Sequence, residues 1–332
     1  MNKQALELNS DRIEMVFHNH ETPAHVTGGV VTPRAVQYHL APAMGVKVNR
    51  VQALANELAL ALGVTNVRVS RQGSSVQLEV PRDDARPVKL LPLMAQLKEL
   101  PAYTATLGMC DDGAPLLVRL ASPNVGHVLI SGTTGSGKTA LCQTIILSLV
   151  MTHRRSQLQI TPFGDFGKLM NIPHIFHKSL PEIASLIPRQ SSDPRIVVLI
   201  DPMTLNGELH TALNLILRQG ANSGIHVIAT TSAPAEFSSF PFLTRLVGKV
   251  PDTNTARAAA GIGGTGAEKL TGHGDFIAVA AGQVVRFQAA YVSAAEMEQV
   301  VAQMGSAPRR WDVVNGRPSL LREATALVAS AK

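Results

Sequence analysis

Short runs of consecutive apolar residues recur between residues 100 and 305, and stretches with helical spacing lie between them. The runs are HVLIS (127–131), LQIT (158–161), RIVVLI (195–200), HVIAT (226–230) and DFIAVA (275–280). Strands covered on both faces form continuous apolar runs, because neither face meets water. The helical candidates are residues 139–152, 209–223 and 254–261. This alternation predicts an α/β fold, with a mainly parallel sheet and helices on both of its faces.

A smaller α/β unit is predicted ahead of this domain. One helix fits residues 49–63, where Asn49 can cap the start and Gly63 can end it. Three strand candidates accompany the helix, at residues 35–41, 67–70 and 76–80. The chain is therefore expected to contain an irregular N-terminal lead-in, a small subdomain, a larger domain and a short C-terminal tail, at residues 1–32, 33–99, 100–305 and 306–332.

The first apolar strand runs directly into a glycine-rich loop, GTTGSGKT, which is followed by a helical stretch. Its glycines allow a tight backbone path whose N–H groups point inward at phosphate oxygens. Lys138 supplies a positive charge, and Thr139 offers a hydroxyl to Mg²⁺ at a helix N-terminus that favours anions. The strand–loop–helix context makes this motif specific. It predicts a nucleoside triphosphate site formed by Gly132, Thr133, Thr134, Gly135, Ser136, Gly137, Lys138 and Thr139.

A second magnesium ligand is expected from Asp201, which follows the apolar strand RIVVLI and would hold the ion through water. The next residue is Pro202, at a position where many ATPases carry a glutamate that activates the attacking water. Proline cannot accept a proton, so the residues favour nucleotide binding more strongly than hydrolysis. Glu208 is the nearest following carboxylate, and we expect it to be a solvated surface residue. No catalytic base is identified.

Composition and charge narrow the choice of partners. The chain has 332 residues, of which 45% are apolar and 16% charged, so a folded core is expected rather than disorder. The formal net charge of +6 permits a polyanionic partner such as DNA but does not require one. The two cysteines fit no metal-binding spacing. No apolar stretch is long enough to span a bilayer, so a soluble, cytoplasmic protein is expected.

Taken in order along the chain, several segments resemble the motor region of the FtsK/SpoIIIE family of DNA translocases, in the wider HerA–FtsK group of P-loop ATPases. The resemblance runs from about Gly28 to about Met304. The segments are LAPAMGVKVNRVQALANELALALG, the lead into GTTGSGKT, NIPHI, SGIHVIATTSAP, GTGAEKLTGHGDFI and RFQAAYVSAAEMEQVV. This ordered set is more specific than any one motif.

The resemblance implies a RecA-like P-loop NTPase core with a mainly parallel sheet, preceded by a smaller α/β subdomain. It implies ATP as the nucleotide, double-stranded DNA as the track, and a homo-oligomeric ring, usually a hexamer. It carries over residues 132–139 as nucleotide ligands, and Thr139 and Asp201 as Mg²⁺ ligands. Typical family members also carry a transmembrane N-terminal region, and no such membrane segment is expected in this chain.

Several positions depart from the family pattern. The glutamate after the strand aspartate is Pro202 here, the Gln-Arg pair of the family's ATQRP segment is Ser232 and Ala233, and the arginine before GIH is Ala221. These changes favour weak or lost hydrolysis. Three functions stay open: a DNA translocase motor subunit, a non-hydrolysing ATP-binding ring subunit with a structural or regulatory role, and a secretion-type ATPase of the same fold.

Overall fold

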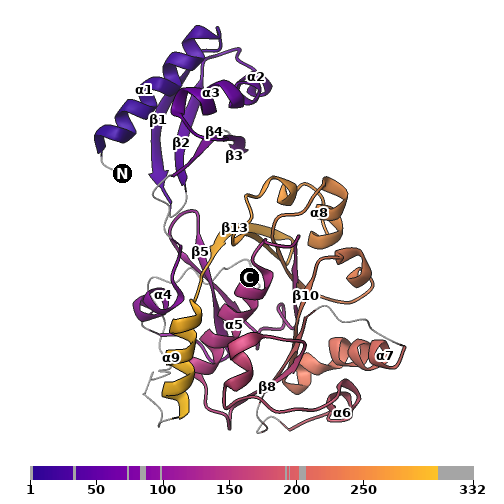
Figure 1. The fold of residues 1–332 in the computed structure, drawn as a ribbon. Helices are drawn as coiled ribbons and strands as arrows, with labels where there is room; N and C mark the ends of the chain where they lie inside the picture. The colour runs from indigo at the N-terminus through magenta and orange to yellow at the C-terminus, as the bar shows by residue number, and fades with distance from the viewer. Residues whose placement is uncertain are drawn as a thin grey trace. The chain divides into compact units, whose positions relative to one another are not determined.

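The computed structural model describes residues 3–32, 35–72, 75–82, 87–97, 99–190, 193, 195–201 and 207–305. The chain forms two compact units, Met1–Pro87 and Val88–Lys332, which we call the N-terminal and C-terminal units (Figure 1). The boundary between them follows Pro87, whereas the sequence placed it after residue 99. The predicted tail 306–332 lies outside the described residues, as does Pro202.

The N-terminal unit is a four-stranded antiparallel sheet with three helices, and its strand order is β1-β2-β4-β3. Ile13 and Phe17 lie one turn apart on the first helix and are fully buried in one core with Leu58 and Leu78. The elements are α1 (Lys3–Asn19), β1 (Ala24–Val31), β2 (Ala35–Pro42), α2 (Val48–Ala53), α3 (Ala55–Leu62), β3 (Arg68–Gln72) and β4 (Ser75–Pro81).

Two expectations for this unit were wrong. Residues 1–32 are not an irregular lead-in, because they supply helix α1 and strand β1. Strand β1 shows little apolar alternation and is defined by its pairing with β2, which local pattern does not reveal. The helix expected at residues 49–63 is two helices, and Asn49 lies inside α2 rather than at its cap. Gly63 ends α3 in a left-handed conformation, as expected.

The C-terminal unit contains a nine-stranded mixed sheet with the order β6-β5-β13-β12-β11-β7-β10-β9-β8. The five strands β11, β7, β10, β9 and β8 are mutually parallel, and the other four pairings are antiparallel. The strands are β5 (Thr104–Cys110), β6 (Pro115–Arg119), β7 (Val128–Ser131), β8 (Leu158–Phe163), β9 (Arg195–Ile200), β10 (Ile225–Thr231), β11 (Thr244–Val247), β12 (Asp275–Ala280) and β13 (Gln283–Ala289). The apolar run at 275–280 is therefore antiparallel, because a tight turn returns the chain directly into β13.

Helices cover both faces of this sheet. In β9, Val197 and Leu199 pack into the core on the α5 side, while Ile196 and Val198 pack into the core of α6 and α7. This alternation explains why the parallel strands are apolar at every position. The helices are α4 (Leu90–Gln96), α5 (Lys138–Thr152), α6 (Leu180–Ala184), α7 (Gly207–Leu215), α8 (Thr253–Ala260) and α9 (Ala294–Gly305), with short turns η1 (Gly167–Asn171), η2 (Ile216–Gly220), η3 (Ala221–Ser223), η4 (Pro234–Phe237) and η5 (Ala267–Lys269).

Helix α5 is buried almost all round, as its uniformly apolar sequence indicates. Within the described ranges, none of the helices combines the length and the apolar character that crossing a bilayer demands.

Neutral histidines lie at the amino ends of the parallel strands. His226 is 1% exposed; its Nδ1 donates to the carbonyl of Gly126 (2.8 Å), and its Nε2 accepts from the Arg195 guanidinium (3.0 Å). Burial, opposed by the Gly126 hydrogen bond and reinforced by the Arg195 charge, lowers the pKa of His226 to about 4. Burial and the neighbouring His226 lower the pKa of His127 to about 3, although a backbone contact with Leu217 opposes this. The folded chain therefore holds both imidazoles uncharged at neutral pH.

We predict that acidification destabilises the chain through His226. An unfolded histidine binds a proton near pH 6.5, so below that pH the unfolded state binds more protons, and stability falls as the pH drops toward about 4. His226 alone should remove about 2 kcal/mol of the free energy of unfolding at about pH 5. Urea unfolding at neutral and acidic pH should show a shallower pH dependence in His226→Gln than in the exposed control His177→Gln. Equal pH dependence in the two variants would contradict this assignment.

Candidate functional site

The glycine-rich loop at residues 132–139, which we call the phosphate loop, leaves β7 at the carboxyl edge of the sheet and enters α5. The predicted order of strand, loop and helix is therefore present. Gly135 and Gly137 have φ angles of +81° and +102°, in the left-handed region that favours glycine. Within the loop, the Ser136 amide donates to the Thr133 carbonyl (3.2 Å). A Cβ atom at Gly132 would lie 2.6 Å from the Ser136 hydroxyl oxygen, so this path excludes a side chain there.

Lys138 folds back over the phosphate loop. Its ammonium donates to the carbonyls of Gly132 (2.9 Å) and Thr133 (3.1 Å). Burial lowers the pKa of Lys138, and the negative charge of Asp201 partly opposes that shift. Because the side chain is only half buried, its charge lies at the mouth of the loop, where an anion can reach it. The Thr139 residue beside it is exposed at the start of α5.

Asp201 follows β9 and is brought close to Lys138, although 63 positions of chain separate them. The hydroxyl of Thr230 donates to Asp201 Oδ1, and the Asp201 amide donates to the Phe163 carbonyl (3.0 Å). A Cβ atom at Gly164 would come within 2.9 Å of the Asp201 Cβ, so a glycine makes room for the carboxylate. The structure therefore brings Lys138 and Asp201 together, the two charged residues that the sequence predicts for the nucleotide site.

The two residues that replace the Gln-Arg pair of the family pattern lie directly after β10. Ser232 and Ala233 are both exposed, and the Ala233 amide donates to the Thr231 hydroxyl (3.0 Å). Glu208 is exposed at the start of α7, as expected. Sequence reasoning missed Thr230, the hydroxyl that orients Asp201. A threonine at the carboxyl end of a buried strand was the available signal.

Further backbone contacts hold the phosphate loop. The Gly132 amide donates to the Thr231 carbonyl at the end of β10 (3.2 Å), and other contacts come from the residues after β11 and from the turn before β12, which lies in the family-like segment GTGAEKLTGHGDFI. The Gly248 amide donates to the Ser131 carbonyl (2.8 Å), and the Thr133 amide donates to the Lys249 carbonyl (2.8 Å). On the other side of the loop, the Gly274 amide donates to the Ser136 carbonyl (2.9 Å). These backbone contacts brace the loop against two further strands of the sheet.

Comparisons with known proteins agree with this architecture. The model of the FtsK alpha domain matches residues 1–82, and the model of the FtsK/SpoIIIE family matches residues 99–189. The DNA translocase FtsK of Staphylococcus epidermidis (strain ATCC 35984) is 28% identical over 87% of this chain. The DNA translocase SpoIIIE of Bacillus subtilis (strain 168) is 25% identical over 90% of it. The chain belongs to the FtsK/SpoIIIE family.

The family similarity extends further toward the N-terminus than the sequence suggested, because the alpha-domain match begins at residue 1 rather than near Gly28. The chain spans 43% of the Staphylococcus relative and 45% of the Bacillus relative, which are therefore much longer proteins.

Solved structures confirm the predicted fold class, a RecA-like P-loop core with a smaller subdomain ahead of it. The pCW3 conjugation coupling protein TcpA, in a monomer form with ATPγS, is 12% identical, with a TM-score of 0.58 over 89% of this chain and 99% of that one. The cytoplasmic domain of the Thermomonospora curvata Type VII secretion ATPase EccC is 18% identical, with a TM-score of 0.57 over 70% of this chain and 36% of that one. At these identities the likeness establishes the fold alone.

We predict that Gly132→Ala is far more damaging than Gly135→Ala. At Gly132 a Cβ meets the Ser136 hydroxyl, whereas at Gly135 nothing lies within 4 Å, and only the left-handed backbone is penalised. Urea unfolding followed by circular dichroism should show losses of about 3 kcal/mol for Gly132→Ala and about 1 kcal/mol for Gly135→Ala. Equal losses would mean that the loop relaxes around the added methyl group.

Proposed function

We propose that this chain is an ATP-binding, FtsK-like DNA translocase motor subunit that acts on double-stranded DNA in the cytoplasm, with weak or lost hydrolysis. The observation that carries the proposal is the pairing of a phosphate loop with Asp201 at the carboxyl ends of the parallel strands. In open α/β sheets, ligands bind at the carboxyl ends of the strands, which is where both features lie.

The residues of this edge fit a triphosphate and its magnesium ion. Close contacts at Gly132 and Gly137 leave little room for side chains, so backbone N–H groups are available to phosphate oxygens, and Lys138 adds a positive charge. Thr139 is exposed at the start of α5, and Asp201, whose charge acts on the neighbouring Lys138, is partly exposed. In this proposal residues 132–139 hold the nucleotide, and Thr139 and Asp201 hold Mg²⁺, which neutralises charge on the phosphates when bound. The fold neighbour TcpA carries an ATP analogue, which supports ATP as the nucleotide.

Weak hydrolysis is proposed because the residue directly after Asp201 is not a proton acceptor. Pro202 has no acceptor, and Ser232 and Ala233 lack the amide and guanidinium groups of the family pattern. These three positions lie after the strands that would flank the terminal phosphate. The same changes favour the second candidate function, a non-hydrolysing ring subunit with a structural or regulatory role.

DNA as the partner and a homo-oligomeric ring, such as a hexamer, are proposed from the family and the charge. The FtsK and SpoIIIE relatives are DNA translocases, and the net charge of +6 suits a polyanion. A secretion-type activity remains the alternative, supported only by the fold likeness to EccC. Binding of duplex DNA would favour the DNA translocase subunit over the secretion-type ATPase.

We predict that the chain binds Mg-ATPγS and that Lys138→Ala abolishes the binding. Removing the ammonium takes away the side-chain cation that folds over the phosphate loop. Calorimetry should register heat with the unmodified chain and none with Lys138→Ala. The control Lys168→Ala removes an exposed lysine from the same unit and should keep its affinity. At a ligand concentration of about 100 Kd, binding should stabilise the chain by about 2.7 kcal/mol. Absence of both heat and stabilisation in the unmodified chain would refute nucleotide binding.

We predict further that duplex DNA binds without strongly accelerating ATP turnover. The logarithm of the DNA affinity should fall linearly with the logarithm of the salt concentration, with a slope of about −0.9 per phosphate contact. Turnover should stay at least about 100-fold below the value of about 10 s⁻¹ typical of enzymes, with or without DNA. Pro202→Glu should raise it, and Lys138→Ala should not. Rapid DNA-stimulated hydrolysis by the unmodified chain would disprove the weak-hydrolysis part of the proposal.

A further inference from the structure

A five-residue turn, TGHGD at residues 271–275, touches the phosphate loop from the side opposite to Asp201. Gly274 is the contact: its amide donates to the Ser136 carbonyl (2.9 Å), and its own carbonyl accepts from the Ala289 amide (2.7 Å). One residue therefore links the phosphate loop to strand β13. We call residues 271–275 the bracing turn.

The backbones of the phosphate loop and the bracing turn approach closely at Gly137, whereas Gly274 is constrained by its own positive φ angle and by the side chain of Gln288. A Cβ atom at Gly137 would lie 3.1 Å from the Gly274 nitrogen. A Cβ atom at Gly274, whose φ is +87°, would lie 2.8 Å from the Gln288 side-chain nitrogen. A small movement of the bracing turn would therefore displace the backbone of the phosphate loop.

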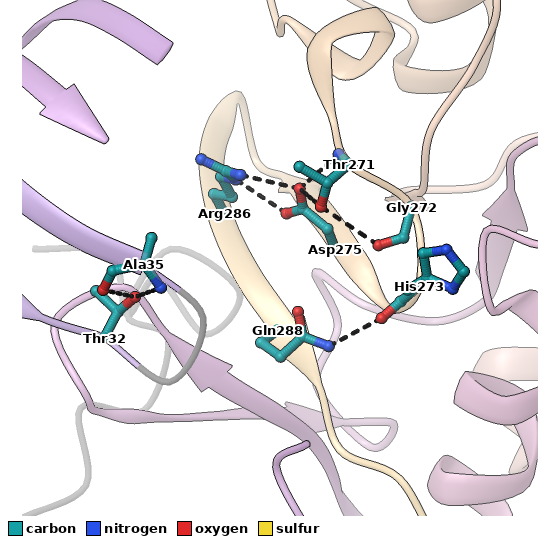
Figure 2. A network of polar contacts seen from close by, with 8 residues as sticks. All are labelled: Thr32, Ala35, Thr271, Gly272, His273, Asp275, Arg286 and Gln288. Carbon is teal, nitrogen blue, oxygen red and sulfur yellow. Dashed lines mark hydrogen bonds and ion pairs between the residues drawn. The ribbon is translucent and has the colours of Figure 1, made fainter. Parts of the chain in front are cut away.

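A buried ion pair fixes the bracing turn. Arg286 donates through Nε to Asp275 Oδ1 and through a terminal nitrogen to Oδ2, both at 2.9 Å (Figure 2). The amide and hydroxyl of Thr271 also donate to Oδ2, at 2.9 and 3.1 Å. Burial by itself raises the pKa of Asp275, but the contacts with Arg286 and Thr271 outweigh it and lower the pKa below its usual value. The carboxylate is 4% exposed and fully engaged.

The middle of the bracing turn is held in an unfavourable conformation. His273 has a φ angle of +52°, which non-glycine residues rarely adopt, and its carbonyl accepts from the Gln288 side chain (3.1 Å). Such a conformation persists only where the surroundings over-determine it, and functional sites are the common location. The ion pair on one side and Gln288 on the other supply that constraint (Figure 2).

Peptide planarity carries the effect of the bracing turn into the phosphate loop. In a trans peptide, the carbonyl of one residue and the amide of the next point in opposite directions. Holding the Ser136 carbonyl on Gly274 therefore directs the Gly137 N–H away from the turn. The peptide between Gly132 and Thr133 obeys the same rule, since its N–H meets Lys249 and its carbonyl meets Lys138. The hydrogen bonds to Gly274 and Lys249 thus determine which N–H and carbonyl groups of the phosphate loop point inward.

We propose that Asp275 and Arg286 are positioning residues for the nucleotide site. They hold the bracing turn so that Gly274 fixes the Ser136–Gly137 peptide in the orientation that offers its N–H to phosphate. This inference rests on the proposed function, that the loop holds a triphosphate. The competing reading is that the pair only stabilises the β12–β13 hairpin.

The test compares three full-length variants. Asp275→Asn removes the charge of the pair, and Arg286→Lys keeps the charge but loses the two parallel hydrogen bonds. The control Arg195→Gln breaks a partly buried polar contact with His226 and Tyr103 at the opposite, amino edge of the same sheet. Calorimetry with Mg-ATPγS gives the affinity, thermal unfolding gives the stability, and hydrogen exchange without nucleotide gives the protection of the loop amides.

Asp275→Asn should weaken Mg-ATPγS binding by about tenfold or more, as loss of a supporting contact commonly does. Arg286→Lys should show a smaller loss in the same direction. Both should speed exchange in the phosphate loop, whereas Arg195→Gln should lower the melting temperature yet keep affinity within about twofold. If Asp275→Asn does not fold, Arg286→Lys decides the question.

The outcomes separate the inference from the proposed function. Unchanged affinity and unchanged loop exchange in the two pair variants, with lowered melting temperatures, would overturn the positioning role and leave a hairpin anchor. An unmodified chain that binds no nucleotide would refute the proposed function instead. Loop exchange, measured without ligand, would then still report whether the pair orders the loop.

Discussion

The candidate site depends on the orientation of two peptide units in the phosphate loop. Each is held from outside by a backbone hydrogen bond, from Thr133 to Lys249 and from Gly274 to Ser136. Because a peptide is planar, each outer contact determines which group faces the inside of the loop. The parallel strands make this possible, since their carboxyl ends meet at one edge and present β7, β11 and the turn before β12 to the same loop.

The site has two sides with different tasks. Asp201 and Thr230 lie on the side of β9 and β10, where the proposed Mg²⁺ would bind. The bracing turn and β11 lie on the other side, where only the backbone path is controlled. The departures from the family pattern at Ser232 and Ala233 fall on the first side, directly after β10, and Pro202 follows Asp201 in the sequence. A chain that retains the loop and its braces while changing the groups around the terminal phosphate would keep binding and lose turnover, which is why the two properties are proposed separately.

The opposite edge of the same sheet is organised by buried polar groups rather than by loops. His226 joins β10 to Gly126, two residues before β7, and to Arg195 of β9, whose guanidinium lies 4.7 Å from the centre of the Tyr103 ring. These contacts tie together the three strands whose other ends carry the candidate site. The pH sensitivity predicted for the sheet therefore arises at one edge, while the charged residues of the site lie at the other.

Features encoded in consecutive residues were predictable from the sequence: the buried parallel strands, the phosphate loop at residues 132–139, Asp201 at a strand end, and the P-loop α/β class. Only the tertiary structure revealed strand β1, the antiparallel β12–β13 hairpin, Thr230 beside Asp201, and the Asp275–Arg286 pair. The physical reason is the separation along the chain between the residues that interact. Periodicity and glycine spacing act over a few residues, whereas β1 exists through its partner strand, and the Gly274–Ser136 contact joins segments 138 positions apart. Such contacts carry no local signature until the chain has folded.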